Sequence, residues 1–222
     1  MIPGVRLVML GRQGAGKGTQ CVRLSRHYVV PHISTGDMLR SAVREGTTFG
    51  KLAKEYMDAG DLLPDDVIVG IVDERLALDD TRARGFILDG FPRTVAQAQT
   101  LLDITQPRGL DLAINLEVAR DAVLARLAAR RVCSDCGANY SVEERPKRGW
   151  ICDVCGGDVI QRADDTEEAI TRRLDLYERE TSPLITWFSE RDLLVEVDGQ
   201  GDPDVVSERL TKVVDRQRER RR

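Results

Sequence analysis

This sequence has few histidines, no excess of positive charge and no long apolar runs. It has two histidines, and neither stands out as a candidate catalytic residue. The formal net charge is −4, which argues against broad binding to nucleic acids. No apolar stretch is long enough to cross a bilayer, and residues 1–5 lead straight into the first expected strand with no room for a signal peptide. We therefore expect a cytoplasmic protein that binds neither membranes nor nucleic acids.

The composition supports a packed core, since 41% of the residues are hydrophobic. The length suits one α/β domain with a small insertion. Short apolar runs that read as strands alternate with helical patterns, at residues 5–10, 32–33, 86–88, 112–116 and 193–197. This alternation predicts a parallel sheet with helices on both faces, and ligands beyond the carboxyl ends of the strands.

A glycine-rich turn, GRQGAGKGT at residues 11–19, lies between the first strand and a helix expected at residues 20–27. Such a turn cradles phosphate, because its backbone N–H groups and the helix N-terminus face the anion and Lys17 reaches the reacting phosphates. Gly18 stands where Ser or Thr normally follows the lysine, and Thr19 comes one place later. A magnesium ion would therefore depend on waters, phosphate oxygens and a carboxylate from elsewhere.

Asp89 is the best candidate for that carboxylate. It ends the third apolar run, so a parallel sheet would place it beside the phosphate cradle, where it can order magnesium through water. Gly90 and Pro92 predict a turn, and Arg93 follows it. The alternative is an ordinary surface turn.

A helical insertion is expected between the second and third strands, at residues 34–63. Ser34 and Asp37 are spaced as a helix cap, and this reading competes with one in which Thr35 and Arg40 contact a ligand. Residues 46–60 form a second small helical unit. Pro64 then precedes an acidic first turn of a helix over residues 66–77.

Arginines gather in the second half of the chain. A helix starting near Asp121 is expected to carry Arg126, Arg130 and Arg131. Further arginines, Arg162, Arg172 and Arg173, follow the cysteine region, where Asp165 and Glu168 predict another helix start. A solvated helix face explains some of these charges, but so many like charges also indicate a bound polyanion.

Four of the five cysteines form two Cys-x-x-Cys pairs with the spacing of a zinc ribbon, namely Cys133, Cys136, Cys152 and Cys155. Gly137 and Gly156 follow the pairs and permit a tight knuckle. Disulfides are the alternative, which a cytoplasmic chain disfavours. Four thiolates leave no open position on zinc, so the metal would be structural and would stabilise a segment too short to fold alone. Cys21 is expected to be a small buried residue.

Taken together, the motifs resemble those of adenylate kinases of the long bacterial type with a zinc-bearing lid. They lie in fixed order at residues 11–19, 34–40, 58–60, 89–94, 97, 130–131 and 162–165. The resemblance implies a three-layer P-loop nucleotide kinase fold with a five-stranded parallel sheet. It also implies a core (residues 1–33, 64–128 and 166–222), an AMP-binding unit (34–63) and a lid (129–165).

The resemblance also implies a reaction and a set of site residues. ATP and AMP would give two ADP reversibly, with Mg²⁺ at Asp89, in a monomer. ATP is expected at Gly14, Ala15, Gly16, Lys17, Gly18, Thr19, Arg130, Asn139, Tyr140 and Gly201. AMP is expected at Thr35, Arg40, Asp61, Leu62, Leu63, Gly90, Phe91, Pro92, Arg93, Gln97, Arg162 and Arg173. The groups around the migrating phosphoryl would be Lys17, Asp89, Arg93, Arg130, Arg162 and Arg173.

Two positions depart from many relatives, which carry proline where Gln13 stands and lysine or glutamine where Gly201 stands. One alternative is another nucleoside monophosphate kinase. Thr35 and Gln97 resemble the adenylate-specific pattern, whereas UMP/CMP kinases usually have alanine at the threonine position. A nucleic-acid-binding zinc ribbon is the other alternative. The ribbon's acidic residues count against it: Asp135, Glu143, Glu144, Asp153 and Asp158.

Overall fold

A computed structural model describes residues 4–162 and 165–220. Its centre is a five-stranded parallel sheet in the order β2-β3-β1-β4-β8. The strands are β1 (Arg6–Leu10), β2 (His32–Ser34), β3 (Phe86–Asp89), β4 (Leu112–Glu117) and β8 (Leu194–Asp198). Each predicted strand is confirmed to within one residue at either end. The signal is clearest in β1, β3 and β4, whose apolar residues are buried on both faces of the sheet.

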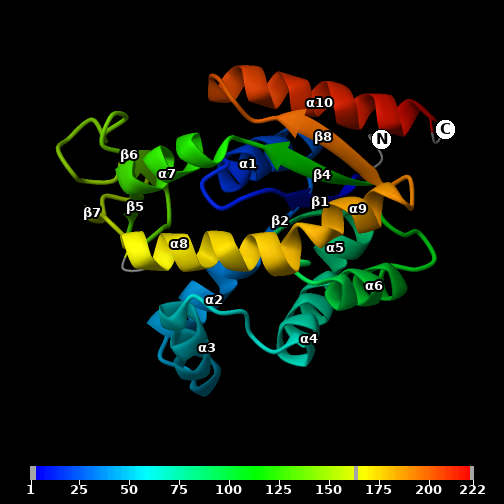
Figure 1. The fold of residues 1–222 in the computed structure, drawn as a ribbon, viewed down its shortest axis with the longest axis horizontal. Helices are drawn as coiled ribbons and strands as arrows, with labels where there is room; N and C mark the ends of the chain where they lie inside the picture. The colour runs from blue at the N-terminus through cyan, green and yellow to red at the C-terminus, as the bar shows by residue number, and fades with distance from the viewer. Residues whose placement is uncertain (1–3, 163–164, 221–222) are drawn as a thin grey trace.

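Helices cover both faces of this sheet (Figure 1). They are α1 (Lys17–Tyr28), α2 (Thr35–Arg44), α3 (Thr48–Ala59), α4 (Asp65–Leu76), α5 (Asp79–Arg84), α6 (Val95–Ile104), α7 (Arg120–Ala129), α8 (Glu167–Leu176), α9 (Pro183–Ser189) and α10 (Pro203–Arg220), with a π-helical turn η1 (Tyr177–Thr181). Along β1, Leu7 and Met9 pack in one apolar cluster with α1 and α10. Val8 and Leu10 pack in the other with α6 and α9. The three-layer architecture is thereby confirmed.

The helical insertion holds α2 and α3, which project below α8 in Figure 1. The Ser34 cap is confirmed, since its side chain accepts a hydrogen bond from Asp37 N at 3.2 Å. The two helices pack closely at Gly50, where an added Cβ would lie 1.9 Å from Ala42 O. Pro64 precedes α4 and the acidic residues of its first turn, as predicted.

A small antiparallel sheet forms the cysteine ribbon, in the order β6 (Asn139–Ser141), β5 (Arg130–Cys133) and β7 (Val159–Ile160). The prediction that Arg130 and Arg131 lie on a helix with Arg126 is wrong. Helix α7 ends at Ala129, and the two arginines start β5. They pair with Ser141 and Tyr140, and this pairing across the ribbon overrides the helical spacing.

The helix start predicted at Asp165 is also displaced. Thr166 is the N-cap of α8, and its side chain accepts a hydrogen bond from Ala169 N at 3.3 Å. Asp165 is buried instead, and its side chain binds Arg130. Two residues of that predicted motif, Ala163 and Asp164, lie outside the described residues. Among the helices the structure describes, none is both long and apolar enough to cross a membrane.

Candidate active site

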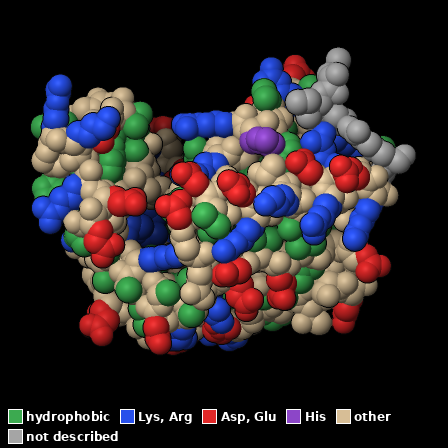
Figure 2. All heavy atoms as spheres, turned by 90° about the horizontal axis from the view of Figure 1, so that it is seen from above, with side chains coloured by type: hydrophobic (Ala, Val, Ile, Leu, Met, Phe, Trp, Pro, Cys, Tyr) green, Lys and Arg blue, Asp and Glu red, His purple; other side chains and the backbone are tan. Residues whose placement is uncertain are grey.

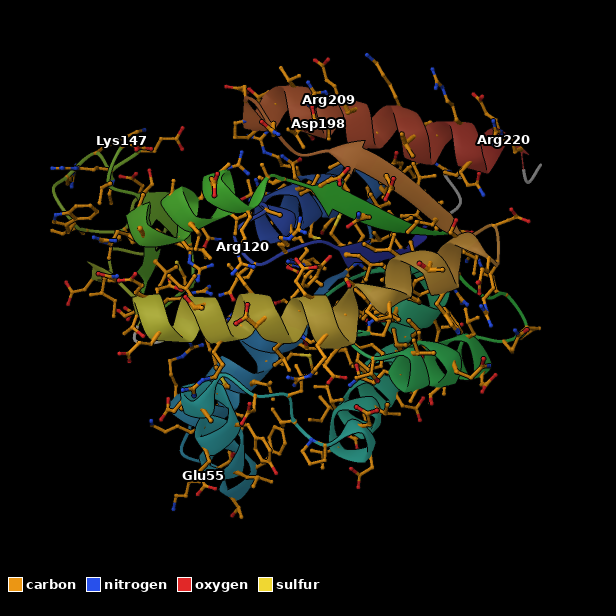
Figure 3. The ribbon with its side chains drawn as sticks, viewed as in Figure 1. Glu55, Arg120, Lys147, Asp198, Arg209 and Arg220 are labelled. Carbon is orange, nitrogen blue, oxygen red and sulfur yellow. The ribbon has the colours of Figure 1, made fainter. Side chains whose placement is uncertain are left out.

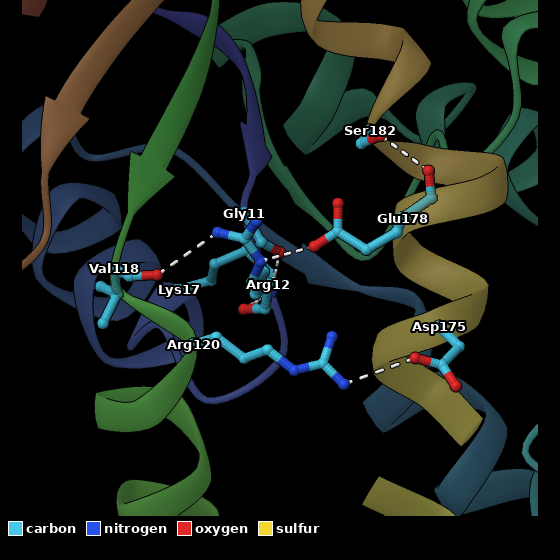
Figure 4. A network of polar contacts seen from close by, with 8 residues as sticks. All are labelled: Gly11, Arg12, Lys17, Val118, Arg120, Asp175, Glu178 and Ser182. Atoms are coloured by element: carbon cyan, nitrogen blue, oxygen red, sulfur yellow. Dashed lines mark hydrogen bonds and ion pairs between the residues drawn. The ribbon is translucent and has the colours of Figure 1, made fainter. Parts of the chain in front are cut away.

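The phosphate cradle joins β1 to α1 at the carboxyl edge of the sheet. Gly14 and Gly16 have φ of 82° and 96°, a left-handed conformation that glycine adopts without strain. Lys17 folds back over the loop, where its Nζ donates to Gly11 O at 2.7 Å and Arg12 O at 2.9 Å (Figure 4). Arg126 donates to Ala15 O (3.2 Å) and Gly199 O (3.3 Å), so it ties the cradle to the turn after β8.

Lys17 is a buried cation with a carboxylate and two arginines near it. Its pKa is lowered to about 8, first because burial penalises the charged form, and then because Arg93 and Arg130 repel it, while Asp89 opposes the shift. Because burial disfavours the charged form of Lys17, a bound anion would stabilise that form. The cradle therefore has the geometry and the electrostatics of a phosphate site.

Asp89 ends β3 beside the cradle, as predicted, and its side chain is 14% exposed. One carboxylate oxygen lies 3.6 Å from His32 Nε2. A Cβ at Gly18 would only touch that same oxygen, at 3.5 Å, so the glycine leaves it open toward the cradle. A carboxylate oxygen facing a phosphate site fits Mg²⁺, which binds oxygen and keeps several waters.

A second pocket lies across the sheet edge, between α2, α4 and α6. Its lining comprises Thr35, Gly36, Leu39, Arg40, Met57, Gly60, Asp61, Leu62, Leu63, Ile68, Gly90, Arg93, Gln97 and Arg173. We call it the monophosphate pocket. It collects nine of the residues predicted to bind AMP. Phe91 and Pro92 are buried rather than part of the lining. Burial raises the pKa of Asp37 on α2, but Arg40, the Ser34 hydroxyl and the charge of Arg162 together lower it, so Arg162 lies close to α2.

Arg93 connects the two sites. Its Nε donates to Gly90 O at 2.9 Å. Burial lowers its pKa to about 10, and the charges of Arg173 and Arg40 add to this, whereas Asp89 opposes it. Because Arg93 lines the monophosphate pocket and its charge also acts on Lys17, it lies close to both sites.

The floor of the monophosphate pocket is a hydrogen-bonded network around Gln97, which is 2% exposed. Gln97 Oε1 accepts from Arg93 N at 2.7 Å, and its Nε2 donates to Asp65 Oδ1 at 2.7 Å. The Thr94 hydroxyl donates to Asp65 Oδ2 at 3.0 Å. Thr35, also 2% exposed, donates to Asp89 O at 3.4 Å. Sequence reasoning missed Asp65, because its place in the first turn of α4 is explained by helix propensity alone.

Arg130 projects from the start of β5 and is held by Asp165. Its Nε donates to Asp165 Oδ2 at 2.8 Å, and its terminal nitrogen bonds the other carboxylate oxygen. The Asp165 side chain is fully buried. This forked ion pair joins the two ends of the cysteine ribbon and orients Arg130 near Lys17.

The other residues predicted near ATP lie in or beyond the ribbon. Asn139 is exposed on β6. The Tyr140 hydroxyl accepts from Asp153 N at 2.8 Å and lies 3.4 Å from Cys152 Sγ. Gly201 lies in the turn after β8, which Arg209 fastens by donating to Asp198 O at 3.0 Å and Gln200 O at 2.8 Å (Figure 3).

The four predicted cysteines converge in the ribbon, with their sulfur atoms within 4.8 Å of one another. Cys133 and Cys155 are 3.4 Å apart, and Cys136 and Cys152 are 3.5 Å apart. These distances exclude disulfides, whose sulfurs lie about 2.05 Å apart, and they suit tetrahedral metal coordination with bonds of about 2.3 Å. Val154 N donates to Cys152 Sγ at 3.4 Å, as the predicted knuckle requires. Cys21 is fully buried on α1, as expected.

Comparison with known proteins decides the family. The family model described as adenylate kinase matches residues 9–193. The chain belongs to the adenylate kinase family. It is 50% identical over 206 residues to the adenylate kinase of Moorella thermoacetica, covering 91% of this chain and 94% of that protein. It is also 50% identical over 201 residues to the Bacillus subtilis adenylate kinase (89% and 92%) and 45% identical over 213 residues to that of Thermoanaerobacter sp. (95% and 98%).

As a member of this family, the chain is an enzyme that transfers a phosphoryl group between ATP and AMP to give two ADP. The fold provides a phosphate cradle and a second pocket at one sheet edge, with cationic side chains between them. This is the arrangement that direct transfer between two nucleotides requires.

Proposed function

We propose that ATP binds with its phosphates on the cradle and AMP binds in the monophosphate pocket, with the terminal phosphoryl group passing directly between them. The observation that carries this proposal is that the cradle and the pocket meet at one edge of the sheet, where Arg93 lines the pocket together with Arg40 and Arg173. The charge of Arg93 also acts on Lys17 of the cradle, as does that of Arg130. Arg93 belongs to both groups, so the cations form one continuous site between the two pockets.

The nucleophile in this reaction is a phosphate oxygen of AMP, which is already anionic near neutral pH. No general base is needed, and catalysis consists of positioning and charge neutralisation. Lys17, Arg93 and Arg173 surround the migrating group, and Arg130 and Arg162 join them from the two ends of the ribbon. Arginine suits this work because its planar fork binds two phosphate oxygens at once. Closure of the ribbon and of the α2–α3 unit would exclude water that could hydrolyse ATP.

Asp89 is the residue we assign to Mg²⁺, which neutralises phosphate charge when bound with ATP. The AMP base would face Thr35, Gln97 and the backbone of residues 61–63, between the apolar side chains of the pocket. The ATP side would be completed by Asn139, Tyr140 and the backbone of Gly201. We also propose the unit boundaries 34–63 and 129–165, with the remainder as core.

We assign Zn²⁺ to Cys133, Cys136, Cys152 and Cys155 as a structural ion, because four thiolates fill its coordination. Metal analysis of the purified protein should give about one zinc per chain. An ordered ribbon in metal-free protein would contradict the assignment. Because one chain supplies both pockets, we propose a monomer, which size-exclusion chromatography can test. Five unpaired cysteines fit a reducing cytoplasm.

The direct test is to mix the protein with ATP, Mg²⁺ and a panel of nucleoside monophosphates and to measure ADP. AMP should be the preferred acceptor, and preference for UMP or CMP would favour the alternative kinase. A nucleic-acid role has little support. On the face seen in Figure 2, basic and acidic side chains are interspersed rather than gathered into one basic surface. Salt-dependent retention on DNA or RNA would revive that role.

A further inference from the structure

The amide of Gln97 is fixed at both ends by partners of opposite character. Its Oε1 accepts from Arg93 N and its Nε2 donates to Asp65 Oδ1, both at 2.7 Å. A backbone N–H can only donate, and an ionised carboxylate can only accept. Only one of the two orientations of the amide satisfies both partners, so the hydrogen bonds themselves assign which end is oxygen and which is nitrogen.

Asp65 is in turn held in place. Its second oxygen accepts from the Thr94 hydroxyl at 3.0 Å, and that hydroxyl also caps α6 by accepting from Gln97 N at 3.2 Å. The network thus joins the first turn of α4 to the first turn of α6. Because Gln97 is 2% exposed, water cannot easily replace a lost partner. Reversal of the amide would break both of its hydrogen bonds at once.

The amide keeps one N–H and one oxygen lone pair for a ligand in the monophosphate pocket. Leu39, Leu63 and Ile68 give that pocket apolar walls suited to a base. A fixed acceptor beside a fixed donor matches the edge of a 6-amino purine, which offers an amine beside a ring-nitrogen acceptor. A 6-oxo purine offers a carbonyl where the amine would be, so its oxygen would meet the oxygen of Gln97.

We propose that Asp65 is a specificity-determining residue, which locks Gln97 in the orientation that accepts a 6-amino purine monophosphate and rejects a 6-oxo one. This rests on the proposed binding of AMP in this pocket. Asp65 acts through Gln97 and has no contact with the reacting phosphates, so it is a positioning residue rather than a catalytic one. An asparagine at this position can donate as well as accept, so it removes the contribution of Asp65 to the lock and leaves the Arg93 N–H as the one partner of fixed character.

The test compares AMP with IMP, which differ at position 6 of the base, in D65N and in the matched control D66N. Asp66 is the exposed neighbour in the same helical turn, so D66N removes the same charge outside the network. In D65N the ratio of kcat/KM for AMP to that for IMP should fall about tenfold, the value of roughly one hydrogen bond. The loss should come from a higher KM for AMP, with kcat and the KM for ATP little changed. D66N should match the parent.

A ratio in D65N equal to that of D66N would overturn the proposal. So would equal losses for AMP and IMP together with a lower Tm, because that result would give Asp65 a structural role only. If D65N does not fold, D65S offers a hydroxyl that also donates and accepts. Calorimetric binding at low temperature then gives the ratio of the dissociation constants of AMP and IMP, which should show the same loss of preference for AMP. Failure of the parent enzyme to use AMP would instead refute the proposed function.

Discussion

The monophosphate pocket and the cysteine ribbon maintain their shapes by different means. Leu39, Leu63 and Ile68 of the pocket belong to the large apolar cluster that fills one face of the sheet. The ribbon's own cluster contains only Cys133, Cys152 and Val159 as buried residues, with Ala138 and Tyr140 packed against it. Two of its three buried members are thus proposed metal ligands.

The contrast implies that the residues of the reaction lie in one part of the molecule, and that the part that depends on metal for its stability is another. The pocket and cradle rest on a core that folds by burial of apolar side chains, so charged residues there can be tuned for catalysis. The ribbon has too little apolar surface to fold alone, so its shape should depend on metal. Changes in the core site should lower turnover with little effect on stability, and changes in the ribbon should do the reverse.

The largest effect is expected from K17M. This change removes the ammonium group that lies on the cradle and should lower kcat by about 10³-fold or more, because a preorganised charge at the reacting phosphates is lost. The fold should survive, since burial already disfavours the charge of Lys17. Steady-state kinetics and thermal unfolding would measure both effects. K212M, on the exposed side of α10, is the control, and near-normal turnover of K17M would remove the lysine from the mechanism.

R93A should give the next largest effect. Arg93 lies between the two groups of cations, so its loss should lower kcat by about 10²-fold for the chemical step. Single-turnover kinetics would separate chemistry from binding. R191A removes a guanidinium that stacks on Trp187, with Cζ 3.8 Å from the ring centre, and should leave the kinetics unchanged. A change in R93A confined to ATP affinity would contradict the bridging role.

Sequence patterns predicted the core far better than the ribbon. The apolar runs of β1, β3 and β4 and the glycines of the cradle are local signals, so the sheet and the phosphate site could be placed from them. Four cysteines with ribbon spacing also predicted their own convergence.

Contacts between residues far apart in sequence could not be predicted in this way. Spacing placed Arg130 on a helix, but its pairing with Ser141 makes it part of a strand. The sequence pattern predicted that Asp165 starts a helix, but its buried carboxylate forms an ion pair with Arg130. Asp65 is a plausible helix-start residue whatever it touches, and only the fold shows its bond to Gln97, 32 positions away. For each of these residues the local sequence suggests a role within a helix, so it gives no sign of the distant residue that the side chain or strand contacts.

C133S tests the ribbon side of the comparison. Loss of one thiolate should release the zinc and lower the Tm by several degrees, while turnover at low temperature falls by less than about twofold. Metal analysis, thermal unfolding and kinetics on the same preparation would show this. S134A changes the neighbouring residue without touching a sulfur and should keep both metal and Tm. Equal loss of stability and turnover would show that the ribbon contributes directly to the chemistry.

The remaining effect needs no substitution and is the pH dependence of ATP binding. The pKa of Lys17 lies near 8 in the free protein because burial disfavours its charge. Bound phosphate favours the charged form, so the complex keeps the proton as pH rises through about 8 while the free enzyme loses it. Affinity for ATP should therefore be full below this pH and fall above it, by about tenfold per pH unit at most.

Stability should respond in the opposite sense. In the unfolded chain the lysine stays protonated up to its ordinary pKa of 10.5, so between 8 and 10.5 unfolding takes up a proton and the contribution of Lys17 to stability increases with pH. Calorimetric titration of ATP and thermal unfolding over this range would measure both trends. In K17R the charge persists throughout, so its ATP affinity should show no such fall. A fall in K17R equal to that of the parent would assign the titration to another group and leave Lys17 charged in the free cradle.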